Sequence, residues 1–165
     1  MEKENVRIYY GSGKGKTALT LGMAMMYAGE GKSVFVIQFL KGRMGEQLDY
    51  MKSLEPDVKV FRFEKSTRYF EDISEEEKQE EIINIRNGLN FARKVLKIGE
   101  CDVLILDEAL GLVDLGIIGS QDLKDIIEAG DDSTQLILTG INLPEGMADC
   151  AGYIARLDVV KNENC

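Results

Sequence analysis

The chain has 165 residues, and its 44% hydrophobic and 30% charged residues are ordinary for a globular protein, so we expect residues 1–165 to form a single domain. The net charge of −9 argues against a nucleic-acid partner, which needs a basic surface, and the absence of histidine excludes histidine-based catalysis. Neither end of the sequence has the apolar stretch of a signal peptide or a membrane span, which favours a cytoplasmic protein with no membrane partner.

A glycine-rich loop follows the first predicted strand. The strand covers about Val6–Tyr10, and the loop then reads Gly11-Ser12-Gly13-Lys14-Gly15-Lys16-Thr17. This loop predicts a phosphate cradle, because glycines let backbone N–H groups turn inward, the Lys16 ammonium reaches the outer phosphates, and the Thr17 hydroxyl can bind Mg²⁺. The usual motif has a glycine where this chain has Tyr10, so the loop is a variant. The alternative, a flexible turn that happens to contain two lysines, is disfavoured by the strand before it and the helix after it.

A helix from about Lys16 to Glu30 and a second strand, Val34–Ile37, are predicted next. The helix is expected to turn its apolar side chains toward the core: Leu19, Leu21, Met23, Ala24, Met26 and Tyr27. Gln38 and Lys41 follow the second strand, at the carboxyl end where open α/β sheets bind ligands. Four basic residues should form a local anion site there: Lys14, Lys16, Lys41 and Arg43. For Lys41 and Arg43, ordinary solvated loop charges are an equal alternative.

The third predicted strand leads into a polar loop that contains aromatic residues. A short helix, Glu46–Leu54, precedes this strand, which covers Val58–Phe63. In the loop from Glu64 to Ile73, Tyr69 and Phe70 are expected at the ligand-binding end of the sheet. They indicate either contact with a ligand or a small hydrophobic latch on the core, and the residues alone leave both open.

A long helix is predicted from Glu75 to Lys97. Ser74 followed by Glu77 is a capping-box pattern, and apolar residues then recur at helical spacing. The acidic first turns, which continue at Glu80 and Glu81, are favoured by the helix dipole. We expect these acidic side chains to be solvated and assign them no function.

A fourth apolar strand, Val103–Leu106, is followed directly by Asp107 and Glu108. In a phosphate-loop nucleotide site, carboxylates at such a strand end emerge beside the phosphates, where one holds Mg²⁺ directly or through water. The remaining predicted elements are helices at Ala109–Leu115 and Ser120–Ala129 and strands at about Gln135–Thr139 and Tyr153–Leu157. Alternating strands and helices predict an α/β fold with a mostly parallel sheet flanked by helices.

Taken together, these segments resemble the P-loop ATP:corrinoid adenosyltransferases. Enzymes of this family attach the 5′-deoxyadenosyl group of ATP to the cobalt of cobalamin or of precursors such as cob(I)yrinic acid a,c-diamide. The matching stretches span nearly the whole chain: Gly11–Thr17, Val36–Gly42, Val103–Glu108, Leu136–Gly140 and Ala148-Asp149. The shortened loop with Lys14 before Gly15-Lys16-Thr17 is the most specific match. The resemblance implies a RecA-like P-loop NTPase fold and a short, diverged member of the family.

The resemblance also implies a reaction and a set of site residues. Reduced cob(I)alamin attacks C5′ of ATP and intact triphosphate leaves, so no general base is needed. The residues implied to bind ATP or the corrinoid are Gly11, Ser12, Gly13, Lys14, Gly15, Lys16, Thr17, Ala18, Gln38 and Tyr69. The implied catalytic residues are Lys16, Lys41 and Phe70, and the implied Mg²⁺ ligands are Thr17, Glu108 and Asp107. Phe70 falls in the aromatic loop with which the family displaces the lower axial ligand of cobalt. A flavodoxin-like reductant and a homodimer are the implied partners.

The chain departs from the family pattern at several places. Ile141 stands where an arginine is usual, Phe70 stands where a tryptophan is common, and Arg68 replaces an aromatic residue. The sequence starts almost at its first strand and ends at Cys165, so we expect it to lack the family's terminal extensions.

Two alternative functions stay open at this point. One is a P-loop ATPase or kinase, in which Glu108 activates an acceptor that attacks the γ-phosphate. The other is a non-catalytic homologue that binds ATP or a corrinoid. The first predicts ADP and phosphate as products, whereas the second predicts binding without turnover.

Overall fold

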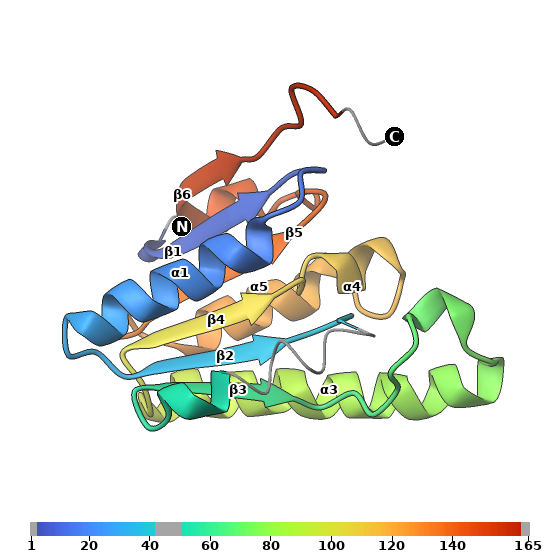
Figure 1. The fold of residues 1–165 in the computed structure, drawn as a ribbon, viewed down its shortest axis with the longest axis horizontal. Helices are drawn as coiled ribbons and strands as arrows, with labels where there is room; N and C mark the ends of the chain where they lie inside the picture. Colours follow the sequence, from blue (N-terminus) through green and yellow to red (C-terminus); the bar gives the residue numbers. More distant parts are fainter. Residues whose placement is uncertain (1–2, 42–50, 163–165) are drawn as a thin grey trace.

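The computed structural model describes residues 3–41 and 51–162, and within them one six-stranded sheet forms the centre of the fold. The strand order is β3-β2-β4-β5-β1-β6, and every neighbouring pair is parallel (Figure 1). The strands are β1 (Lys3–Tyr10), β2 (Val34–Gln38), β3 (Val58–Arg62), β4 (Val103–Asp107), β5 (Gln135–Gly140) and β6 (Ala151–Arg156). Because all of them run the same way, their carboxyl ends meet at one edge of the sheet.

Helices cover both faces of the sheet (Figure 1). The α-helices are α1 (Lys16–Gly29), α3 (Glu75–Ile98), α4 (Gly111–Asp114) and α5 (Ser120–Ala129). The described residues also include three short 3₁₀ helices: η1 (Lys52–Leu54), η2 (Phe70–Asp72) and η3 (Ala148–Cys150).

Side chains alternate along the central strands and so form two apolar cores. On β2, for example, Val34 and Val36 belong to the core that α1 covers, whereas Phe35 and Ile37 belong to the core that α3 and α5 cover. Both faces of the central strands are therefore buried, which explains why these strands read as continuous apolar runs.

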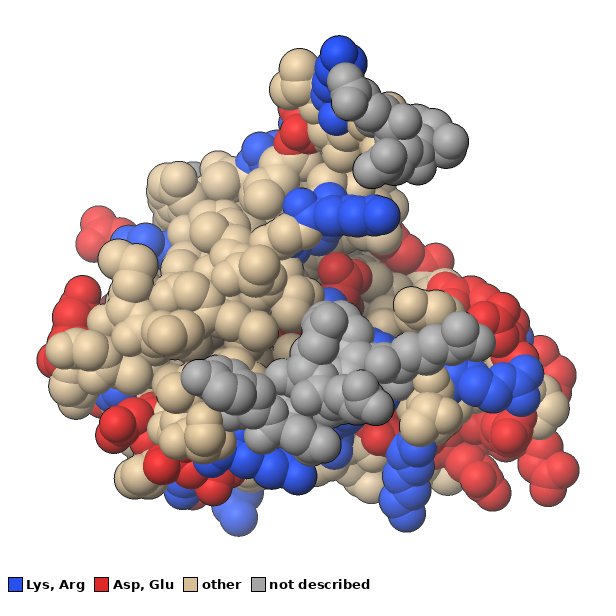
Figure 2. Space-filling view, viewed as in Figure 1, with Lys and Arg blue, Asp and Glu red and all other residues tan. Residues whose placement is uncertain are grey.

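The α/β, RecA-like P-loop fold expected from the sequence is confirmed, and most element boundaries agree within a few residues. The Ser74 capping box is present, with the Ser74 hydroxyl accepting from the Glu77 backbone and the Glu77 carboxylate accepting from the Ser74 backbone. Acidic side chains gather over the start of α3, as the charge pattern predicts (Figure 2). No helix in residues 3–41 and 51–162 is long and apolar enough to cross a membrane.

Three expectations need correction, and a fourth lies mostly outside the described residues. Met26 is 71% exposed, because the buried line of α1 runs instead through Lys16, Thr20 and Ala24 at helical spacing. Glu81 is buried rather than solvated, since its carboxylate accepts from the Lys65 backbone and the Asn84 amide. The helix expected at Ala109–Leu115 is shorter in the structure, where α4 covers only Gly111–Asp114. Most of the helix expected at Glu46–Leu54 lies outside the described residues, and only its end is seen, as η1.

Candidate functional site

A cleft of about 640 Å³ lies at the carboxyl edge of the sheet, where the loop after β1 meets the start of α1. Its lining is Ser12, Gly13, Lys14, Gly15, Lys16, Thr17, Ala18, Leu21, Tyr69, Glu108 and Ile141. The glycine loop therefore forms one wall of the cleft, as a phosphate cradle requires. Tyr69, Glu108 and Ile141 come from distant parts of the sequence and close the opposite side.

The glycine loop depends on backbone conformations that only glycine adopts easily. Gly11 has φ +138° and Gly15 has φ +109°. A Cβ on Gly11 would also collide with the carbonyl of Leu157, which follows β6 and whose N–H donates to the Tyr10 carbonyl at 2.7 Å. The segment after β6 thus packs tightly against the back of the loop and fixes its path.

The Lys16 ammonium lies inside the curve of the loop. It donates to the carbonyls of Gly11 at 2.6 Å and Gly13 at 2.8 Å, and the residue is only 6% exposed. These contacts hold a positive charge in the wall of the cleft, which Lys16 lines. Lys14 also lines the cleft, but its side chain is exposed.

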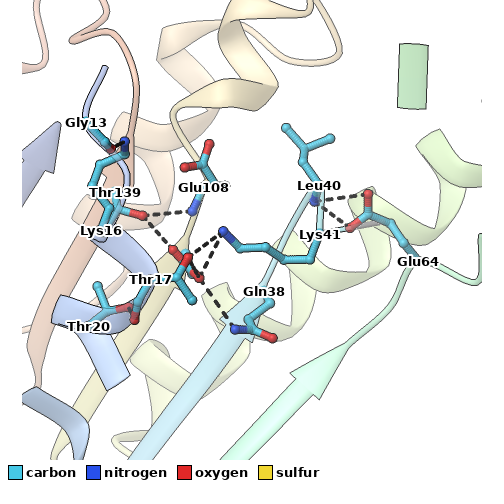
Figure 3. Close-up of polar contacts among 11 residues, drawn as sticks. Gly13, Lys16, Thr17, Thr20, Gln38, Leu40, Lys41, Glu64, Glu108 and Thr139 are labelled. Atoms are coloured by element: carbon cyan, nitrogen blue, oxygen red, sulfur yellow. Dashed lines mark hydrogen bonds and ion pairs between the residues drawn. The ribbon is translucent and has the colours of Figure 1, made fainter. Parts of the chain in front are cut away.

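Asp107, at the end of β4, is fully buried and contacts several polar side chains below the cleft. Figure 3 shows three of these contacting residues, Thr17, Lys41 and Thr139. Its Oδ1 accepts from the Thr139 hydroxyl at 2.8 Å, and its Oδ2 accepts from the Thr17 hydroxyl at 3.1 Å. The Lys41 ammonium lies 3.3 Å from Oδ2 and donates to the Thr17 hydroxyl at 2.7 Å. Gln38, opposite Asp107 in the β2–β4 register, donates to Oδ2 at 3.5 Å.

Glu108 turns away from this network and into the cleft. Its backbone has φ +61°, and its N–H donates to the Thr139 hydroxyl at 2.9 Å, so one threonine orients both acidic residues. Burial raises the pKa of the Glu108 carboxyl, and the nearby Lys41 charge acts in the opposite direction. A side chain at Gly111 would crowd Leu40, because an added Cβ would lie 3.0 Å from its Cδ1, and it would contact the Glu108 Oε2 at 3.4 Å.

A second cavity of about 230 Å³ adjoins the cleft. Its lining is Leu40, Tyr69, Phe70, Glu71, Glu108, Gly111, Asp114, Leu115 and Ile141. Three of these residues, Tyr69, Glu108 and Ile141, also line the cleft, so the two cavities meet there. Phe70 belongs to the second cavity alone.

The predicted site residues thus lie in three places. Ser12–Thr17, Ala18, Tyr69 and Glu108 line the cleft, and Phe70 lines the adjoining cavity. Gln38, Lys41 and Asp107 are buried below the cleft. Gly11 begins the loop but is not one of the residues that line the cleft. Arg43 lies outside the described residues. Sequence reasoning missed Thr139, although its position at the carboxyl end of β5 is a signal that could have identified it.

Oxygen ligands for a metal ion are available at this site. Hydroxyl and carboxylate oxygens are the ligands that Mg²⁺ prefers, and the oxygens of Thr17 and Asp107 already converge on one cation, the Lys41 ammonium. Among residues 3–41 and 51–162, however, no group of three or more acidic, cysteine or histidine side chains could hold a metal alone. Bound Mg²⁺ would therefore need further oxygens from a substrate or from water.

Comparison with known proteins gives a consistent result along the whole chain. A family model described as ATP:corrinoid adenosyltransferase BtuR/CobO/CobP matches residues 2–164. The corrinoid adenosyltransferase of Escherichia coli (strain K12) is 25% identical over 163 residues, covering 98% of this chain and 80% of that protein. Corrinoid adenosyltransferase CobA of Salmonella typhimurium has the same identity and coverage. The corrinoid adenosyltransferase of Pseudomonas aeruginosa is 24% identical, with coverage of 98% and 78%.

Proposed function

Because the chain belongs to the ATP:corrinoid adenosyltransferase family, we propose that it transfers the 5′-deoxyadenosyl group of ATP to the cobalt of a reduced corrinoid and releases triphosphate. The observation that supports this most directly is the junction of two cavities. The cleft with the glycine loop suits a triphosphate. The adjoining cavity has both apolar residues, such as Phe70 and Leu115, and acidic residues, such as Glu71, and this mixture suits a corrinoid, which has an apolar ring face and amide groups at its edge. The atoms that react would meet near Tyr69, Glu108 and Ile141, which both cavities share.

The proposed reaction needs positioning and charge stabilisation rather than acid–base catalysis. The electron pair of Co(I) in the substrate attacks C5′, the C5′–O bond breaks, and the triphosphate leaves with the bonding pair. Negative charge develops on the leaving group, where the loop N–H groups and the ammonium groups of Lys14 and Lys16 would stabilise it. A chain without histidine can perform this chemistry.

Mg²⁺ is part of the proposal. Thr17, Glu108 and Asp107 would hold it together with phosphate oxygens, and the metal would neutralise charge on the leaving triphosphate. The chemistry and spacing of these oxygens support this assignment, because the Thr17 hydroxyl and the Asp107 carboxylate lie 3.1 Å apart and both are oxygen ligands that Mg²⁺ prefers.

Phe70 and Tyr69 are proposed to contact the corrinoid. Phe70 lies in η2 and lines the second cavity without lining the cleft. A ring at this position suits displacement of the lower axial ligand of cobalt, which makes Co(II) easier to reduce. The reaction from cob(II)alamin would then need an electron donor, for which a flavodoxin-like protein is the proposed partner.

An anaerobic assay tests the proposed function. The purified protein is mixed with ATP, Mg²⁺ and chemically reduced cob(I)alamin, the visible spectrum is followed, and the nucleotides are separated by chromatography. We expect light-sensitive adenosylcobalamin and free triphosphate in equal amounts. ADP and phosphate without a Co–C product would instead identify an ATPase, and nucleotide binding without any product would identify a binding protein.

A further inference from the structure

Leu40 has an unusual backbone conformation between β2 and Lys41. Its φ is +58°, in the left-handed region that a leucine rarely adopts and that costs about 1–2 kcal/mol. The residue before it is held by the sheet, since the Phe39 N–H donates to the Asp107 carbonyl at 3.0 Å. Leu40 itself lies beyond the last residue of β2, so another group must hold its strained backbone.

The Glu64 carboxylate is that group (Figure 3). Its two oxygens accept from the Leu40 N–H at 3.0 and 3.2 Å. Glu64 is itself fixed from α3, because the next residue, Lys65, donates its N–H to the buried Glu81 carboxylate at 3.0 Å. The contacts thus run from α3 through Glu64 to Leu40, and the residue after Leu40 is Lys41.

Lys41 depends on this path for its direction. It is 8% exposed, and its ammonium contacts Thr17 and Asp107 below the cleft. A change of Leu40 to the right-handed conformation would rotate the peptide that leads into Lys41 and carry the ammonium away from Thr17. The strained φ of Leu40 and the position of Lys41 are therefore linked.

We infer that Glu64 is a positioning residue, whose carboxylate holds Leu40 in its left-handed conformation and thereby keeps the Lys41 ammonium at the base of the cleft. The role of Lys41 toward the triphosphate rests on the proposed function. The link between Glu64 and Lys41 does not, because it can be measured by nucleotide binding without turnover.

The electrostatics of Glu64 agree with this role. Burial raises its pKa to about 7, and the Glu81 carboxylate on α3 acts in the same direction. The Leu40 N–H and the positive charges of Arg62 on β3 and Lys41 after β2 act against the rise. A pKa near 7 means that the charge of Glu64 is not what defines its role, which is instead to accept a hydrogen bond from the Leu40 N–H.

A double-mutant cycle tests the inference, with MgATP as the probe and titration calorimetry as the measurement. The proteins are wild type, Glu64→Ala, Lys41→Ala and the double variant. We expect each single change to weaken MgATP binding by about five- to tenfold, and the double variant to bind no more weakly than Lys41→Ala alone. Glu64→Gln keeps one acceptor oxygen for the Leu40 N–H and should restore most of the affinity.

Two further variants separate positioning from general stability. Glu64→Met fills the same volume without an acceptor and replaces Glu64→Ala in the cycle if the alanine variant does not fold. Glu77→Ala removes the capping box of α3, so it should lower stability while leaving MgATP affinity unchanged in both the wild-type and Lys41→Ala backgrounds.

Three outcomes would overturn the inference. The first is that Glu64→Ala and Glu64→Met both bind MgATP with wild-type affinity. The second is that the Glu64 substitution weakens MgATP binding as much in the Lys41→Ala background as in the wild type. The third is that Glu64→Gln binds MgATP as weakly as Glu64→Met. The proposed function fails separately, in the turnover assay, whatever the result of this cycle.

Discussion

Replacing Thr139 with valine tests whether one hydroxyl organises the two acidic residues of the site. Thr139 is fully buried, and valine has nearly the same shape, so the change removes two hydrogen bonds without leaving a cavity. The Asp107 carboxylate loses a charge-assisted donor, and the Glu108 N–H loses its acceptor. At about 1–3 kcal/mol for each group left unpaired, we expect a loss of about 3 kcal/mol in the free energy of unfolding.

Thr134→Val is the matched control. Thr134 is 1% exposed, and its hydroxyl makes one bond, to the Cys101 carbonyl at 3.1 Å, at the opposite end of β4. This change should cost about 1 kcal/mol. Urea unfolding of both variants gives the comparison, and MgATP titration should show weaker binding for Thr139→Val alone. Equal stability losses, or equal nucleotide affinities, would refute the assignment of Thr139 as the residue that orients Asp107 and Glu108.

Three other predictions concern the loop, the pH dependence and the second cavity. Gly11→Ala should lower both the melting temperature and the MgATP affinity, because its Cβ would collide with the Leu157 carbonyl. Gly15→Ala should lower the melting temperature less, because Gly15 also has a positive φ, +109°, but has no neighbour within 4 Å of an added Cβ. Since the pKa of Glu64 is raised from 4.5 to about 7, the folded state binds more protons than the unfolded state between these values. Wild-type stability should therefore fall relative to Glu64→Gln as pH rises from about 4.5 to about 7, by up to about 3 kcal/mol, and a parallel pair of pH curves would contradict this. Phe70→Ala should leave MgATP affinity unchanged and slow adenosylation from cob(II)alamin, and an undiminished rate would return its loop to a purely structural role.

The order of the elements could be predicted because each one has a local signal. Apolar runs mark the buried strands, and Ser74 with Glu77 marks the start of α3. Local signals do not determine burial, however. Met26 is apolar but faces outward, while Glu81 continues an acidic run but is buried by its contacts with Lys65 and Asn84. Both cases are decided by which elements pack against the helix.

The candidate site could be predicted only in part, for a similar reason. The glycine loop and the acidic pair after β4 have recognisable patterns in the sequence. The contact between Glu64 and Leu40 has none, because it joins the ends of two neighbouring strands and depends on a left-handed leucine. The order of the strands in the sheet could not be predicted either, since alternating strands and helices do not indicate that β1 lies between β5 and β6.

The position of β1 has a consequence for how the chain folds during synthesis. β1 is the first of the described strands to be made, yet its partners in the sheet are β5 and β6, so Val6 pairs with Leu136. The Lys3 ammonium also donates to carbonyls at the end of α5 and just beyond it, those of Ile127 and Gly130. On a ribosome, β2 can pair with β3 and β4 before β5 and β6, the partners of β1, have been synthesised. We therefore expect nascent chains that stop before β5 to gain no protection from MgATP against proteolysis, because the strand that precedes the glycine loop lacks both of its sheet partners until β5 and β6 have been made.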